Sequence, residues 1–152
     1  MPIDREQALK LSIPPIEVEI EPGRLRLFAK ITGQTDPIYS DLTAAFAAGH
    51  RGLPIPPTFL FSLELESPDP FAYLAELGVD LRYVLHGEQS FHYEALIYGG
   101  DTVTLQSNIT DVYARKDGAL EFVVKETGIT RNNELVGQSQ SVIVVRNPVP
   151  SS

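Results

Sequence analysis

Apolar and polar residues alternate along most of the second half of the chain, from about residue 79 to residue 146. A two-residue period is typical of strands with one face on a core and the other in water. Four segments carry it: residues 81–96, 101–115, 119–130 and 135–146. The short polar turns around Asp117-Gly118 and Asn132-Asn133 favour hairpins. We therefore predict an antiparallel meander of long strands.

Within these strands, particular positions are expected to share a face. Val103, Leu105 and Ile109 form one such set, and Leu120, Phe122 and Val124 form another. Gly87 interrupts the first strand and predicts a β-bulge. Because bulges often re-aim side chains towards sites, His86 becomes a candidate functional residue.

The first half of the chain alternates in this way only at 16–20, where we predict a strand. Helical patterns follow, and they occupy residues 23–33, 40–50, 57–67 and 69–78. Gly33 is a natural stop for the first of these helices, and Asp41 or Thr43 is a suitable cap for the second. The third, centred on Thr58–Leu65, is apolar nearly all round, which predicts burial on several sides.

A buried helix and long strands together indicate one α+β domain. We predict that residues 1–146 form a long antiparallel sheet wrapped around the central helix, and that residues 147–152 form a flexible tail. A long open sheet edge favours pairing with a second chain, so we expect a dimer.

The composition limits the classes of partner and of chemistry that we expect for this protein. The net charge of −8 and the absence of a basic run argue against nucleic acid. The chain has no cysteine, and its three histidines have no metal-ligand spacing, so we expect no metal and no cofactor. No signal peptide and no apolar run long enough for a membrane are visible, and we expect a cytoplasmic protein.

The segment from Leu27 to Phe59 resembles the signature of the MaoC-like dehydratases, which include the R-specific enoyl-CoA hydratases. The positions that match in order and spacing are Phe28, Ala29, Gly33, Pro37, Ile38, Asp41, Gly49, Pro54 and Ile55. A later glycine-aspartate pair of the family matches Gly100 and Asp101. The resemblance implies a hot-dog fold, in which a sheet wraps a helix.

The same alignment places substitutions at the catalytic positions. Gln34 stands where the resemblance implies the catalytic aspartate, and Tyr39 stands where it implies the histidine. A glutamine amide does not titrate near neutrality, and tyrosine, with a reference pKa of about 10, is a poor base. Asp36 is a nearby carboxylate that could replace the lost group. The family's histidine-glycine becomes Pro57-Thr58, and proline has no backbone N–H to donate.

The resemblance implies that the chain is the non-catalytic half of a hydratase or dehydratase. It would bind an acyl thioester and pair with a catalytic MaoC-like subunit, or with a second copy of itself. The expected substrate-binding residues are Gly33, Gln34, Thr58, Phe59 and His86.

Three alternatives remain open. The chain could be a stand-alone enzyme that uses Asp36, Tyr39 or His86. It could bind acyl-CoA without turnover. The Gln34–Tyr39 segment could also be a plain turn whose polar groups cap the neighbouring helix.

Overall fold

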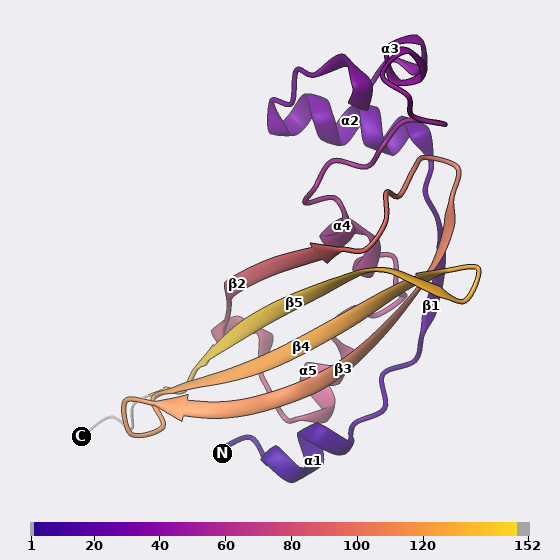
Figure 1. The fold of residues 1–152 in the computed structure, drawn as a ribbon. Helices are drawn as coiled ribbons and strands as arrows, with labels where there is room; N and C mark the ends of the chain where they lie inside the picture. Colours follow the sequence, from indigo (N-terminus) through magenta and orange to yellow (C-terminus); the bar gives the residue numbers. More distant parts are fainter. Residues whose placement is uncertain (1, 149–152) are drawn as a thin grey trace.

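The computed structural model describes residues 2–148, in which five antiparallel strands form one sheet in the order β1-β3-β4-β5-β2 (Figure 1). The strands are β1 (Ile16–Glu19), β2 (Val84–Tyr93), β3 (Thr102–Arg115), β4 (Leu120–Arg131) and β5 (Glu134–Arg146). The helices are α1 (Arg5–Lys10), α2 (Pro22–Thr32), α3 (Leu42–Ala47), α4 (Leu60–Glu64) and α5 (Ala72–Glu76), with 3₁₀ turns η1 (Pro37–Tyr39) and η2 (Leu81–Tyr83).

The predicted hairpins join the last three strands. Lys116, Asp117 and Gly118 between β3 and β4 have φ angles of 52°, 52° and 85°. Asn132 and Asn133 between β4 and β5 have φ angles of 53° and 62°. Glycine, asparagine and aspartate tolerate positive φ better than other residues, which explains why the local sequence predicts these turns.

The predicted meander is wrong for β2, which pairs with β5 at the edge of the sheet and not with β3. The connection after β2 instead crosses the end of the sheet, where the Glu94 and Ala95 N–H groups donate to the Val136 carbonyl. Alternation along a strand identifies its faces but carries no information on its neighbour.

The predicted bulge is confirmed, since the β2–β5 register shifts between His86 and Glu88. A Cβ on Gly87 would lie 2.8 Å from Val144 Cγ2 and 3.0 Å from the Val142 carbonyl oxygen. Only glycine fits this close approach of the two strands without displacing a neighbour.

The central helix α4 is shorter than predicted, because Pro56–Phe59 form turns and the helix begins at Leu60. Phe59, Leu60 and Leu63 are buried, whereas Leu65 directly after the helix is 46% exposed. The predicted burial on several sides therefore holds for Phe59, Leu60 and Leu63 but not for Leu65. Helices α4 and α5 lie along one face of the sheet (Figure 1).

Helices α2 and α3 lie together at one end of the sheet (Figure 1). Gly33, with φ of 71°, ends α2 as predicted, and the Asp41 carboxylate caps α3 by accepting from the Thr43 N–H at 2.8 Å. Helix α1 was not predicted. The Asp4 carboxylate caps it, and its buried Ala8 packs with the β3 residues Ile109 and Val112.

The face of β4 that turns towards the core is opposite to the one that carries Leu120, Phe122 and Val124. Val123, Thr127 and Ile129 point inward and are at most 1% exposed, and Lys125 on the same face is 9% exposed. The expected set lies on the opposite face, where the Phe122 ring stacks on Tyr113 with centroids 4.8 Å apart. Over residues 120–124 the outward face carries three apolar residues and the inward face carries Glu121 and Val123, so the period alone does not identify the inward face.

The carboxyl-terminal strand ends in an anchored residue. The Asn147 N–H donates to the Ala119 carbonyl at 3.0 Å, and its side-chain amide donates to Glu121 Oε2 at 2.7 Å. Asn147 is therefore tied to the hairpin and is not part of a free tail. Residues 149–152 of the predicted tail lie outside the described residues.

Candidate functional site

The turn from Gln34 to Tyr39 follows α2 directly, and its polar groups form hydrogen bonds with the backbone of the turn and of α2. The Gln34 N–H donates to the Ala29 carbonyl at 2.9 Å. Gln34 Oε1 accepts from the Asp36 N–H at 3.2 Å, and Asp36 Oδ1 accepts from the Ile38 N–H at 3.1 Å. The polar groups of Gln34 and Asp36 are therefore engaged in holding the turn, which is the structural role that Asp36 plays as the cap of η1.

Tyr39, at the end of this turn, is half-buried and lies close to Tyr93 of β2. Burial, with a smaller contribution from Tyr39, raises the pKa of Tyr93 to about 12. The Tyr93 hydroxyl donates a hydrogen bond to the Pro57 carbonyl. The end of β2, the Pro57 turn and the substituted signature thus meet at one place, and the Tyr93 phenol stays protonated at neutral pH.

The other predicted binding residues near this place have different environments. Phe59 is 2% exposed, and its ring meets Phe28 edge to face with centroids 5.2 Å apart. Thr58 is exposed, as are Gly33 and Gln34. Phe59 is therefore a core residue in this chain, and the exposed residues could contact a ligand or a second chain.

His86 belongs to a second group of residues, on the other side of α4. Its ring meets Phe61 edge to face at 5.5 Å, and Nε2 lies 3.1 Å from Gln89 Oε1. It helps line a cavity of about 230 Å³, together with Glu64 and Lys125. The predicted site residues therefore fall into two groups and do not form one constellation.

The structure reveals a buried polar cluster that the sequence interpretation missed. Lys125 Nζ of β4 donates to Glu64 Oε2 of α4 at 2.7 Å, and the Ser139 hydroxyl of β5 donates to Glu64 Oε1 at 2.8 Å. The side chains of Glu64 and Lys125 are 8% and 11% exposed. Lys125 also lies 5.0 Å from the centre of the Tyr73 ring, and burial together with the Glu64 carboxylate raises the Tyr73 pKa above its ordinary value.

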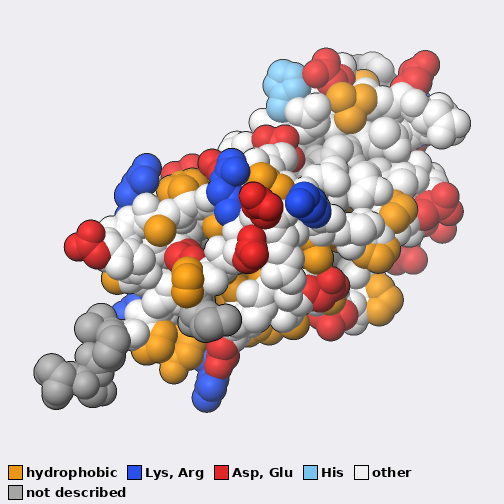
Figure 2. Space-filling model, turned by 90° about the horizontal axis from the view of Figure 1, so that it is seen from below, with side chains coloured by type: hydrophobic (Ala, Val, Ile, Leu, Met, Phe, Trp, Pro, Cys, Tyr) orange, Lys and Arg blue, Asp and Glu red, His pale blue; other side chains and the backbone are white. Residues whose placement is uncertain are grey.

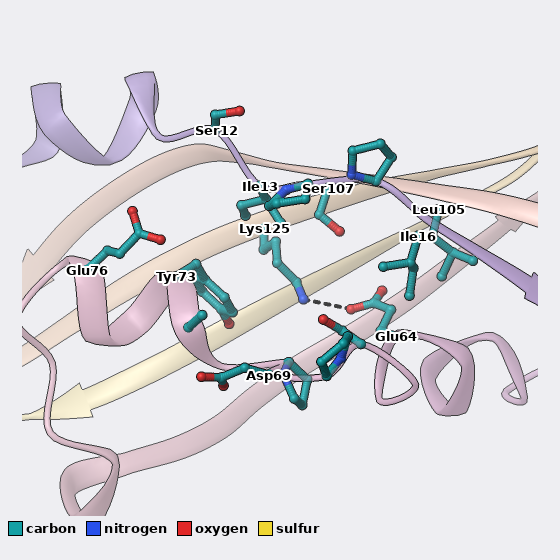
Figure 3. A pocket seen from close by; sticks show the side chains of 16 residues that line it. Ser12, Ile13, Ile16, Glu64, Asp69, Tyr73, Glu76, Leu105, Ser107 and Lys125 are labelled. Carbon is teal, nitrogen blue, oxygen red and sulfur yellow. Dashed lines mark hydrogen bonds and ion pairs between the residues drawn. The ribbon is translucent and has the colours of Figure 1, made fainter.

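This cluster forms part of the wall of a cavity of about 450 Å³ between the segment 12–16, α5 and β3 (Figure 3). The only sequence signals were Glu64 at the end of a largely apolar helix and Lys125 directly after the apolar run 122–124. Each is an ordinary surface residue by type, so neither signal pointed to a site.

Asp101, which matches the glycine-aspartate pair of the family, has a structural role. Its carboxylate binds Arg51 Nη2 at 2.8 Å, Arg131 Nη1 at 2.6 Å and the Tyr98 N–H at 2.9 Å. Burial alone would raise the pKa of Asp101, but these hydrogen bonds outweigh it and hold the pKa below the ordinary value. Asp101 thereby fixes the connection between β2 and β3.

The surface gives no sign of a site for a polyanion on the face seen in Figure 2, where basic side chains lie singly among acidic ones. Among residues 2–148, no group of histidine and carboxylate side chains has the arrangement of a metal site. Over the same described residues, no helix combines the length and apolar content needed to cross a bilayer.

An antiparallel sheet that curves around a short helix, with a signature turn at one end, defines a class of protein. It is the hot-dog fold of the MaoC-like dehydratases and hydratases. Residues 11–138 match the model of the FAS1-like dehydratase domain region. The chain belongs to this family, which confirms the resemblance seen in the sequence.

A curated relative, a UPF0336 protein of Thermobifida fusca, is 30% identical over 151 residues, which cover 99% of each chain. Among solved structures, a chain of the HadBC (3R-hydroxyacyl-ACP dehydratase) complex of Mycobacterium tuberculosis superposes with a TM-score of 0.75. That match has 20% identity and covers 88% of this chain and 92% of the other. A chain of the ChsH1–ChsH2 complex of the same organism gives a TM-score of 0.74 and 22% identity, over 91% and 90% of the two chains.

Proposed function

We propose that this chain is the substrate-binding, non-catalytic subunit of a heteromeric hydratase or dehydratase that acts on an acyl thioester. The observation that carries the proposal is the turn from Gln34 to Tyr39. It keeps the family frame, but an amide and a phenol occupy the acid–base positions. Neither group exchanges protons readily near neutral pH, so this chain needs a partner to supply them.

The free edge of the sheet supports the need for a partner. Strand β2 is a ten-residue edge strand whose outer backbone groups have no strand beside them within the described sheet. Leu81, Tyr83 and Leu85 around its start are each 40% exposed or more. Long edges with apolar flanks favour strand pairing with another chain, and the HadBC and ChsH1–ChsH2 neighbours are heteromeric complexes.

The cavity beside β2 supports the choice of an acyl ligand. Phe61, Leu65 and Phe71 give it apolar walls, and β2, the edge where the partner would add, also lines it. A thioester held at the partner's acid–base pair could extend its acyl chain into this space. No group in the proposal requires a cofactor.

Co-expression with a catalytic MaoC-like subunit tests the proposal. We expect a stable heterodimer by size-exclusion chromatography and loss of the enoyl absorbance when 2-enoyl-CoA substrates are added. Changing the partner's catalytic aspartate to asparagine should lower the rate by a factor on the order of 10² to 10⁴. The single chain should show no turnover.

Asp36→Asn separates this proposal from the stand-alone enzyme. Asparagine caps a helix about as well as aspartate, so the variant keeps the turn while it removes the carboxylate. An unchanged rate of the heterodimer is expected. Turnover by the purified single chain that disappears in Asp36→Asn would instead assign the chemistry to this subunit.

A further inference from the structure

A band of polar side chains crosses the inner face of the sheet and divides the hydrophobic core. Two adjacent cross-strand rows form it, Gln89–Ser141–Lys125 and Ser139–Thr127–Ser107. The buried apolar residues fall into two separate clusters, one that contains Leu60 and Ile129 and one that contains Leu74 and Val123. A sheet that served only as a packing surface would be expected to continue its apolar face across this band.

The two cavities flank this band and meet at it. The larger, of about 450 Å³, opens beside the segment 12–16, and the smaller, of about 230 Å³, opens beside His86 of β2. Glu64, Pro70, Tyr73 and Lys125 line both of them. The cavities therefore lie on either side of the Glu64–Lys125 pair, and we call the two together the transverse passage.

The closing pair retains hydrogen-bonding capacity. An ammonium group has three N–H donors, and within the described residues Lys125 Nζ has one hydrogen bond, to Glu64. Tyr73, whose ring lies beside Lys125, is only 5% exposed. Figure 3 shows Glu64, Tyr73 and Lys125 pointing towards one another at the cavity.

A chain that enters the transverse passage from either mouth would meet this pair with its far end. A methyl group there would displace water from two charges without replacing any hydrogen bond. A hydroxyl or carbonyl oxygen could accept from Lys125, and a hydroxyl could also donate to Glu64. The end of the passage thus favours oxygen over hydrocarbon.

We propose that the transverse passage binds an acyl chain whose far end carries an oxygen function, and that Glu64 and Lys125 determine this specificity. The choice of an acyl chain as the ligand rests on the proposed function. The preference for a terminal oxygen rests only on the burial and geometry of the pair.

Calorimetric titration with decanoate and 10-hydroxydecanoate tests the preference. The two probes carry the same carboxylate, so the negative charge of the protein affects both equally. One hydrogen bond to a charged group should make the hydroxylated probe bind about tenfold more tightly. Equal binding, or tighter binding of decanoate, would overturn the proposal on the unaltered protein alone.

The double variant Glu64→Leu/Lys125→Met replaces the pair with apolar side chains and leaves no unpaired charge. It should reverse the preference, so that decanoate binds more tightly. The matched control Glu6→Leu/Lys10→Met makes the same changes at an exposed ion pair of α1 and should keep the tenfold preference. A double variant at the buried pair that kept the preference would also refute the assignment.

The outcome is independent of the heterodimer test, because the probes contain no thioester and need no partner. A preference for 10-hydroxydecanoate with no hydratase activity in any complex would retain the passage and reject the proposed function. An active heterodimer whose single subunit binds both probes equally would retain the proposed function and reject the specificity of the passage.

Discussion

Removing the lysine of the buried pair gives the sharpest test of the structure. Lys125→Met keeps most of the apolar stem but leaves the Glu64 carboxylate, 8% exposed, with only the Ser139 hydroxyl as a partner. Breaking a buried ion pair in this way costs about 3 to 5 kcal/mol of unfolding free energy. The loss should be visible in urea unfolding followed by far-UV circular dichroism.

Proton uptake limits the part of the loss that comes from the stranded charge, because a stranded carboxylate can be neutralised instead of staying charged. Protonating a glutamic acid with the reference pKa of about 4.3 costs about 3.7 kcal/mol at pH 7 and about 1 kcal/mol at pH 5. We therefore expect Lys125→Met to lose nearly 4 kcal/mol at pH 7 but only about 1 kcal/mol at pH 5. A loss of stability that becomes smaller as the pH falls is the signature of an unpaired buried acid.

Two further variants complete the experiment. Lys10→Met removes a lysine from an exposed pair in α1 and should cost less than about 0.5 kcal/mol at either pH. Glu64→Leu/Lys125→Met should lie within about 1 kcal/mol of the wild type, because apolar replacement of a buried pair is often neutral and only the Ser139 hydroxyl loses a partner. A loss in Lys125→Met that is the same at both pH values would refute the reasoning.

Three other predictions concern the frame around the site. Gly87→Ala should destabilise the chain by about 1 to 3 kcal/mol because its Cβ would lie 2.8 Å from Val144 Cγ2, whereas the control Gly128→Ala, whose nearest neighbour is at 3.7 Å, should change urea stability little. The lowered pKa of Asp101 means that its stabilisation is present above pH 4 or so and is lost as the pH falls, so Asp101→Asn should flatten the acid side of a stability–pH curve. Because the pKa of Tyr93 is raised in the folded state, its contribution to stability is present below about pH 10 and is lost as the pH rises to about 12. Tyr93→Phe should therefore reduce the loss of unfolding free energy measured between these pH values.

The features that could be predicted from the sequence are those that short-range physics determines. The two-residue period gave the long strands, and Asp117-Gly118 and Asn132-Asn133 gave their turns, because the positive φ angles there select few residue types. Gly33 ended α2 for the same reason. The signature turn could also be predicted from the sequence, since its hydrogen bonds join residues two positions apart.

Features that depend on distant segments were missed. The partner of β2 is β5, and nothing in the sequence of β2 indicates that its neighbour is β5 and not β3. The inward face of β4 carries Lys125 and Thr127, while Phe122 points outward and stacks on Tyr113. A long amphipathic side chain such as lysine is normally placed on the surface by any reasoning from residue type.

The buried cluster could not be predicted, because it unites residues 61 and 75 positions apart in the sequence. Its place in the core also bears on its role. A buried ion pair seldom stabilises a fold more than apolar residues of similar volume would. If Glu64→Leu/Lys125→Met is as stable as the wild type, the pair is unnecessary for folding, and its position at the junction of two cavities leaves ligand recognition as its function. If the double variant unfolds, the pair instead specifies how α4 docks on the sheet, and the preference of the unaltered protein for 10-hydroxydecanoate becomes the deciding measurement.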